Sequence, residues 1–221
     1  MKIIGHRGAA GLALENSSAS IKKAVELGVD VIEIDVRLTD DDVLVVNHDA
    51  SLGRTSPDKR LIRDYTWDEL KDVKLKDGSS LLRLEDALEL ANNTMLLIEL
   101  KDEGSIKSLL KVLNAHPKAA VEICSFKLQQ LAKLKKQQPK LSCMALAFSH
   151  PSRAIEFSKA HGLDGVGVPV WCWWPTVYRR VTKAGLSCYT YTVNNDFWGH
   201  FIMRFWPNVD ICTNHPERFI V

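Results

Sequence analysis

The sequence predicts a (β/α)8 barrel with a small insertion after the second barrel strand. Short apolar, β-branched runs alternate with helical patterns along the chain, which favours βα units and parallel strand pairing. Eight such repeats in 221 residues lie near the lower limit for this barrel. A doubly wound open sheet is the alternative, but it would need fewer strands. We therefore expect residues 1–221 to form a single barrel domain, with the insertion at about 43–82.

The predicted barrel strands are short runs rich in apolar residues: 3–5, 31–37, 95–100, 120–124, 142–147, 164–168, 187–193 and 208–212. The second strand alternates cleanly, with Glu33 and Asp35 on one side and Ile32 and Ile34 on the other. A further strand at 43–46 opens the insertion, and the polar stretch 50–80 contains one short helix at 66–70.

The helical patterns between the strands have recognisable ends. Asn16 or Ser17 can cap the first helix, Pro175 and Asp196 fit helix starts, and Gly162 and Gly185 fit helix stops. We expect helices at 17–27, 84–91, 105–115, 127–137, 151–160, 175–184 and 196–204.

The overall composition excludes several classes of protein. Lys and Arg number 29 against 27 Asp and Glu, a net charge of +2, which argues against a nucleic-acid partner. The 5 cysteines are odd in number and widely spaced, so they predict neither a disulfide framework nor a zinc site. Reduced cysteines suit a cytoplasmic protein. We expect no signal peptide and no transmembrane segment, because the apolar runs are too short.

Unusual polar residues cluster at the carboxyl ends of the predicted strands, where barrel enzymes carry their chemistry. Two of these strands end with polar pairs at i, i+2 spacing, which places both side chains of a pair on one face. Sequence register alone therefore brings together the following residues: His6, Arg7, Glu33, Asp35, His48, Glu99 and Lys101.

These residue types fit displacement at a phosphodiester. Three carboxylates in one barrel mouth repel one another, and a divalent cation with oxygen ligands, Mg²⁺ or Ca²⁺, relieves that repulsion. Two histidines can act as general acid and base near neutral pH. Arg7 and Lys101 can bind the anionic group, and arginine offers a two-pronged fit to phosphate oxygens.

The motifs resemble those of the glycerophosphodiester phosphodiesterases over essentially the whole chain. The matching stretches are His6-Arg7-Gly8, Glu15-Asn16-Ser17, Glu33-Ile34-Asp35-Val36, His48-Asp49, Leu52-Gly53-Arg54-Thr55 and Glu99-Leu100-Lys101. The resemblance implies a (β/α)8 barrel, a divalent cation and cleavage of glycerophosphodiesters to an alcohol and sn-glycerol 3-phosphate.

The resemblance also implies a role for each matching residue. His6 and His48 match the acid–base pair, and Arg7 and Lys101 match the phosphate contacts. Glu15 and Asn16 match a stretch that borders the substrate pocket. The metal ligands are matched by Glu33, Asp35 and Glu99. Small departures, such as Leu14 in place of the usual Pro, should alter loops and leave the catalytic positions intact.

A tryptophan-rich stretch follows the sixth predicted barrel strand, at 170–175. It could pack beneath its loop or form a homodimer contact. Alternatively, Trp173 could belong to an aromatic wall that binds the substrate head group, or the stretch could be a surface patch for lipid or a partner. Two other functions stay open: a lysophospholipase D-like phosphodiesterase acting on lysolipids, and a non-catalytic barrel that binds phosphodiesters.

Overall fold

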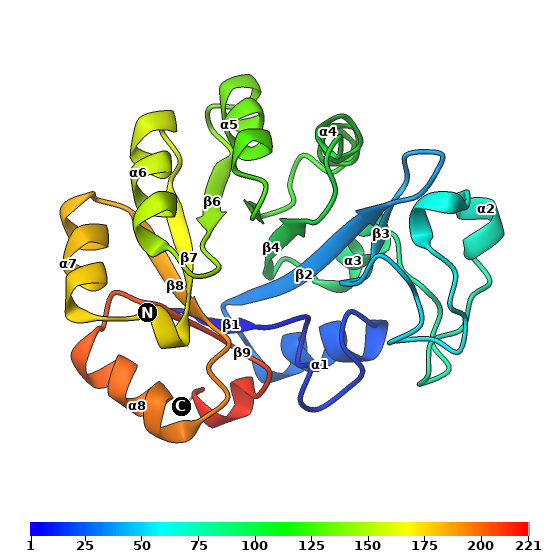
Figure 1. Cartoon of the computed structure of the whole chain (residues 1–221). Helices are drawn as coiled ribbons and strands as arrows, with labels where there is room; N and C mark the ends of the chain where they lie inside the picture. Colours follow the sequence, from blue (N-terminus) through cyan, green and yellow to red (C-terminus); the bar gives the residue numbers. More distant parts are fainter. Residues whose placement is uncertain (221) are drawn as a thin grey trace.

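The computed structural model describes residues 1–220 and has the predicted (β/α)8 barrel (Figure 1). Eight strands run parallel, and β1 pairs with both β2 and β9, which closes the sheet on itself. The barrel strands are β1 (Ile3–Gly5), β2 (Val31–Leu38), β4 (Met95–Leu100), β5 (Val121–Ser125), β6 (Ser142–Leu146), β7 (Gly165–Pro169), β8 (Ser187–Tyr191) and β9 (Asp210–Thr213).

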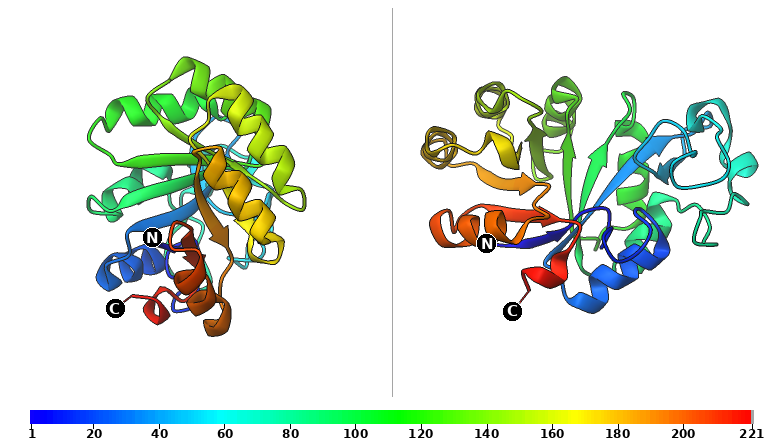
Figure 2. Two further views of the ribbon diagram at one scale, coloured as in Figure 1. Left: turned by 90° about the vertical axis from the view of Figure 1, so that its left-hand side faces the viewer. Right: turned by 60° about the horizontal axis from the view of Figure 1, so that its bottom comes forward.

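Helices lie outside the strands (Figure 2) and connect each barrel strand to the next one along the chain, as repeated βα units require. They are α1 (Ser18–Leu27), α2 (Trp67–Leu70), α3 (Leu84–Leu90), α4 (Ile106–Ala115), α5 (Leu128–Gln137), α6 (Pro151–His161), α7 (Pro175–Lys183) and α8 (Asp196–Phe205). Short 3₁₀ turns occur at Ile62–Asp64, Val170–Cys172 and Pro216–Arg218. Each helix and strand begins and ends within about two residues of its predicted bounds. The remaining differences lie at the ends, where local capping decides the last residue.

The cap of α1 shows how local chemistry sets such an end. Ser17 accepts a hydrogen bond from the Ser20 backbone N–H, and the Ser20 hydroxyl accepts one from the Ser17 N–H. This reciprocal pair satisfies two donors that the first helical turn leaves free. Gly28 closes the helix with a positive φ of 73°. Of the two predicted caps, Ser17 is therefore the correct one, and Asn16 is left for the site.

The barrel has two apolar layers that separate structure from chemistry. The large outer layer lies between strands and helices and includes Ile32 and Ile34. A small inner cluster fills the barrel below the carboxylates, with Val31 two residues before Glu33 and Leu97 two residues before Glu99. The period of two along each strand therefore places apolar side chains at the barrel floor and charged ones at its mouth.

The segment between β2 and α3 has its own small core. Strand β3 (Leu44–Val46) runs antiparallel to β2, with Val36 opposite Val46. A separate apolar cluster covers this hairpin: Val45, Leu52, Ile62, Leu70, Val73 and Leu81. The Asn47 N–H donates to the Asp35 carbonyl at 3.0 Å, which fixes the following residue, His48, beside β2. The proposed division into one domain with an insertion at about 43–82 stays a prediction.

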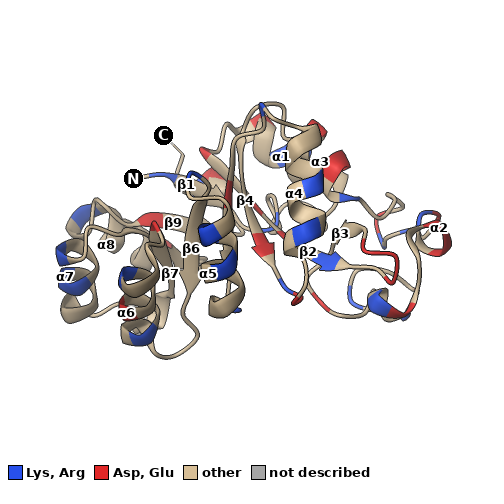
Figure 3. Ribbon diagram, turned by 90° about the horizontal axis from the view of Figure 1, so that it is seen from above, with Lys and Arg blue, Asp and Glu red and all other residues tan. Residues whose placement is uncertain are grey.

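The charged residues and the cysteines are distributed as the near-balanced charge and the odd cysteine count led us to expect. Basic and acidic residues are interspersed over the helices and the insertion (Figure 3). All five cysteines are free; four of them are buried, and Cys172 is partly buried. Among residues 1–220, no helix has both the length and the apolar character needed to cross a membrane.

Candidate active site

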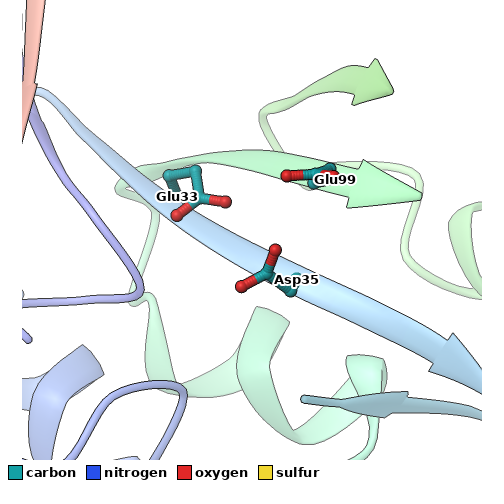
Figure 4. A group of neighbouring side chains, drawn as sticks. All are labelled: Glu33, Asp35 and Glu99. Carbon is teal, nitrogen blue, oxygen red and sulfur yellow. The ribbon is translucent and has the colours of Figure 1, made fainter. Parts of the chain in front are cut away.

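The three predicted carboxylates converge at the mouth of the barrel (Figure 4). Strands β2 and β4 are parallel neighbours, and Asp35 lies directly opposite Glu99 in their register. Each of Glu33, Asp35 and Glu99 offers an oxygen within 4.8 Å of the other two, and all three residues are buried. This geometry could hold one metal ion between two adjacent strands.

Two fixed cations lie against this cluster. The Lys101 ammonium is 2.8 Å from Glu99 Oε1 and 3.2 Å from Asp35 Oδ1. Arg7 Nε is 3.2 Å from Asp35 Oδ2. Burial opposes ionisation of Asp35, but the charges of Lys101 and Arg7 outweigh it and lower the Asp35 pKa to about 2. Asp35 is therefore charged at neutral pH.

The pKa values of the two glutamates shift in the opposite direction. Burial, followed by repulsion from Asp35, raises the pKa of Glu33 well above its usual range and that of Glu99 to about 7. Asp35 Oδ1 is buried, and its 3.2 Å contact with the Lys101 ammonium lacks the geometry of a hydrogen bond. Three close carboxylates, one of them with an oxygen that has no hydrogen bond, are groups that a hard divalent cation would satisfy, so the residues present fit such an ion.

His6 lies at the end of β1, on the rim of the cluster. Its Nδ1 is 2.6 Å from the Asn214 Oδ1, so the ring N–H at Nδ1 donates to that amide oxygen. Its Nε2 is left facing the mouth, 3.9 Å from Glu33 Oε2. Burial, and then the charge of Arg7, lower the His6 pKa to about 4. The ring is therefore neutral, with Nε2 as the free acceptor.

His48 follows β3 and is held by a chain of charged groups. Its Nδ1 is 2.7 Å from Asp49 Oδ1, and Arg54 Nε donates to Asp49 Oδ2 at 2.5 Å. Arg54 also pairs with Glu15, which in turn accepts from Arg7 at 2.7 Å. Burial lowers the pKa of His48, while Asp35 and Asp49 oppose that shift.

Strained backbone positions aim the loop after β1 at the cluster. Arg7 and Asn16 adopt left-handed φ values of 51° and 54°, which are uncommon for residues other than glycine. The Arg7 N–H donates to Glu33 Oε2 at 2.8 Å, and the Asn16 amide donates to Asp35 Oδ2 at 2.9 Å. At Gly8, a Cβ would lie 2.6 Å from the Ser20 backbone, so only glycine allows this close approach.

Comparison with known proteins decides the family. The model of the glycerophosphoryl diester phosphodiesterase family matches residues 6–218. The chain belongs to this family.

Three relatives show the extent of the similarity. The chain is 29% identical to a glycerophosphodiester phosphodiesterase of Bacillus subtilis, over 98% of this chain and 84% of that protein. It is 32% identical to a human lysophospholipase D, over 48% of this chain and 38% of that protein. The structure of an Oleispira antarctica phosphodiesterase in complex with the product sn-glycerol-3-phosphate has a TM-score of 0.91 and 24% identity, and covers 99% of this chain and 94% of that one.

In this phosphodiesterase, Trp173 is placed for packing. Its side chain is 6% exposed, and its ring centroid lies 5.9 Å from that of Trp206 at the end of α8. It belongs to the outer apolar layer, between the strands and the helices. The expectation that Trp173 lines a substrate wall does not fit this position, so we leave it out of the proposed site. Its neighbours Trp171 and Trp174 are exposed.

Sequence reasoning missed three residues of the phosphodiesterase site. Asn214 orients His6, Asp49 contacts His48, and Arg54 links Asp49 to Glu15. Asp49 and Arg54 stand within stretches that resemble the family, which was the available signal, but the partners of all three residues are side chains that only the folded chain brings close. His215, next to Asn214, instead contacts Glu217 at 3.1 Å.

Proposed function

We propose that this phosphodiesterase hydrolyses glycerophosphodiesters to an alcohol and sn-glycerol 3-phosphate, using a divalent cation and two histidines. The observation that carries the proposal is the buried cluster of Glu33, Asp35 and Glu99 at the barrel mouth, with a histidine on its rim. Buried carboxylates so close together are unfavourable unless a cation joins them. Family membership supplies the reaction class.

The cation would be held by Glu33, Asp35 and Glu99. Oxygen ligands favour Mg²⁺ or Ca²⁺ over softer metals. When bound, such an ion supplies positive charge that offsets the charge growing on the phosphate in the transition state.

Arg7 and Lys101 bind the phosphate, because both cations follow the ends of β1 and β4 and lie 3.2 Å from the Asp35 carboxylate at the mouth. Glu15 and Asn16 act through these groups: Glu15 holds the Arg7 guanidinium, and Asn16 holds the Asp35 carboxylate. Both residues thereby set the position of the phosphate without needing to touch it.

The hydrogen bonds of the two histidines suggest their separate roles. Because His6 Nδ1–H donates a hydrogen bond to Asn214 Oδ1, the proton stays on Nδ1 and Nε2 is free to accept a proton from the attacking hydroxyl or water. Burial lowers the pKa of His48, and Asp49 opposes that shift by stabilising the protonated ring, the form that a general acid needs. As the new bond to phosphorus forms, the bond from phosphorus to the leaving oxygen breaks, and His48 gives that oxygen its proton.

A coupled assay for glycerol 3-phosphate tests the function. We expect release of this product from a panel of glycerophosphodiesters, and no release from simple phosphomonoesters or from phosphodiesters that lack glycerol. The assay needs no assumption about head group, so absence of product from every member of the panel would contradict the proposal.

A lysophospholipase D-like activity is the second candidate, and similarity to the human lysophospholipase D favours it. Lysolipids added to the same panel separate the two, because their cleavage releases a lysophosphatidic acid in place of glycerol 3-phosphate. A non-catalytic barrel is disfavoured, since binding alone would not require both histidines and all three carboxylates. A homodimer and a cytoplasmic location stay predictions.

Asp49→Asn tests the proposed role of His48 as an acid. We expect kcat to fall roughly 10-fold or more, with KM nearly unchanged, since the amide cannot stabilise an imidazolium. The Asp49 carboxylate raises the pKa of His48, so its loss lets the acid deprotonate at lower pH. The alkaline limb of the kcat profile should therefore move to lower pH, as measured by steady-state rates between pH 5 and 9.

The matched control is Asp58→Asn, which removes an Asp–Arg pair of the same type elsewhere in the insertion. It should leave both kcat and the pH profile unchanged. An unshifted alkaline limb in Asp49→Asn, together with a reduced rate, would mean that Asp49 only stabilises the fold of the insertion.

A further inference from the structure

Large exposed aromatic side chains gather at one end of the barrel. Each exposed aromatic of residues 1–220 follows one of the strands β5 to β8 closely in sequence, with the exception of Phe205 at the far end of α8. We call the others the aromatic rim: Phe126, Phe148, Trp171, Trp174, Phe197 and Trp198. Their exposed fractions run from 39% to 73%. Folded proteins rarely leave so much aromatic surface in water without a use for it.

The aromatic rim borders the active site. Its loops and the catalytic residues both follow the carboxyl ends of barrel strands, so they share one face of the molecule. Phe126 packs edge-on against Tyr191, with ring centroids 6.4 Å apart, and the Tyr191 hydroxyl donates to the Ala147 carbonyl at 2.5 Å. A surface that covers the rim would therefore lie over the mouth where substrate enters.

Three of the loops that carry the rim are almost free of charge. The connections 126–127, 147–150 and 170–174 contain no Asp or Glu and a single Lys, Lys127, whereas Asp196 directly precedes Phe197 and Trp198 at the start of α8. In contrast, the connections after β1 and β4 carry Arg7, Glu15 and Lys101. Phe and Trp on loops without carboxylates can enter the head-group region of a lipid layer without burying a negative charge.

A cavity of about 560 Å³ between α5 and α6 adds phosphate-binding groups to this surface. Phe126, Phe148 and Phe157 line it together with Lys127, Arg153 and Glu103, whose carboxylate lies 4.0 Å from the Lys127 ammonium. Long basic side chains can keep their stems on the aromatic rings while their heads reach lipid phosphates. The surface thus offers rings for the apolar part of a lipid layer and cations for its phosphates.

We propose that the aromatic rim docks this enzyme on a zwitterionic phospholipid surface, from which the active site takes a single-chain lysolipid as substrate. The substrate part of this proposal rests on the second candidate function, the lysophospholipase D-like activity. A second copy of the chain is a less suitable partner for the aromatic rim, because it would cover the mouth of the active site. A lipid layer instead delivers substrate through the same contact.

Sedimentation of the full chain with phosphatidylcholine vesicles tests the docking. We expect wild type to bind, and Trp171→Ala/Trp174→Ala to need at least about 10-fold more lipid for half-maximal binding. The matched control is Phe205→Ala, which removes a similarly exposed aromatic from the opposite end of α8 and should bind like wild type. Hydrolysis of a water-soluble glycerophosphodiester should be the same in all three proteins, which verifies that each is folded.

The outcomes separate this proposal from the proposed function. Absence of vesicle binding by wild type, or equal binding by the double variant, overturns the docking. So does analytical ultracentrifugation that finds a wild-type dimer and a monomeric double variant, because the rim would then be an interface between copies. If no diester is hydrolysed but the double variant alone loses vesicle binding, the docking stands and the proposed function fails.

Discussion

Alanine at His6 or at His48 is expected to lower kcat for glycerophosphodiester hydrolysis by about 10²-fold or more, since each histidine transfers one of the two protons. Neither loss can be made good by the other ring, because each is held in place by its own partner. His6 is bonded to Asn214, and His48 to Asp49. Steady-state release of glycerol 3-phosphate measures the effect, with circular dichroism to verify folding.

The two variants should also lose different limbs of the pH profile. A general base must be neutral, and burial followed by Arg7 holds the His6 pKa at about 4. The wild-type acidic limb of kcat/KM should therefore lie well below pH 6.5 and disappear in His6→Ala. A general acid must be protonated, so His48→Ala should lose the alkaline limb.

His116→Ala is the control for both variants. This ring lies at the end of α4, and its Nδ1 contacts only the Val112 carbonyl. We expect its kcat and pH profile to equal those of wild type. Turnover like that of wild type in both His6→Ala and His48→Ala would remove the proposed acid–base roles.

The sequence was sufficient to locate the carboxylate cluster because strand geometry is regular. Glu33 and Asp35, two residues apart, must share a face of β2, and Glu99 and Lys101 must share a face of β4. Parallel barrel strands then place both pairs at one end. The structure adds the pairing of Asp35 opposite Glu99, which the pattern within either strand alone does not give.

Partners that are distant in sequence could not be predicted in the same way. The His6–Asn214 bond joins residues 208 positions apart, and no periodic pattern connects them. The Arg54–Glu15 pair forms only because the insertion folds against the loop after β1. Trp173 shows the converse limit: three tryptophans stand within four residues, yet the turn of the chain buries Trp173 and exposes Trp171 and Trp174.

Removal of the divalent cation should abolish activity and also change the pH dependence of stability. With EDTA, Glu99 has a pKa of about 7 because of burial and the charge of Asp35. The folded protein then binds a proton that the unfolded chain has lost above about pH 4.5. Stability of the cation-free protein should therefore fall by about 3 kcal/mol as the pH rises from about 4.5 to 7.

A bound cation should reverse this loss, because it replaces the proton as the partner of the carboxylates. Addition of Mg²⁺ or Ca²⁺ should therefore raise Tm more at pH 8 than at pH 5, and should restore hydrolysis. Differential scanning calorimetry and the coupled assay measure the two effects separately. Activity that persists in EDTA would contradict the proposed metal dependence.

Glu99→Gln tests whether the carboxylate cluster itself is responsible. Without that carboxylate, the cation-free protein should be more stable than wild type at pH 8, since Asp35 and Glu33 face one charge fewer. The gain in Tm from added cation should shrink, and hydrolysis should be lost. Asp102→Asn is the matched control, because Asp102 also follows β4 but pairs with Arg37 outside the cluster. A variant that gains stability while it loses activity would show that Glu99 serves to bind the cation and that it lowers the stability of the cation-free protein.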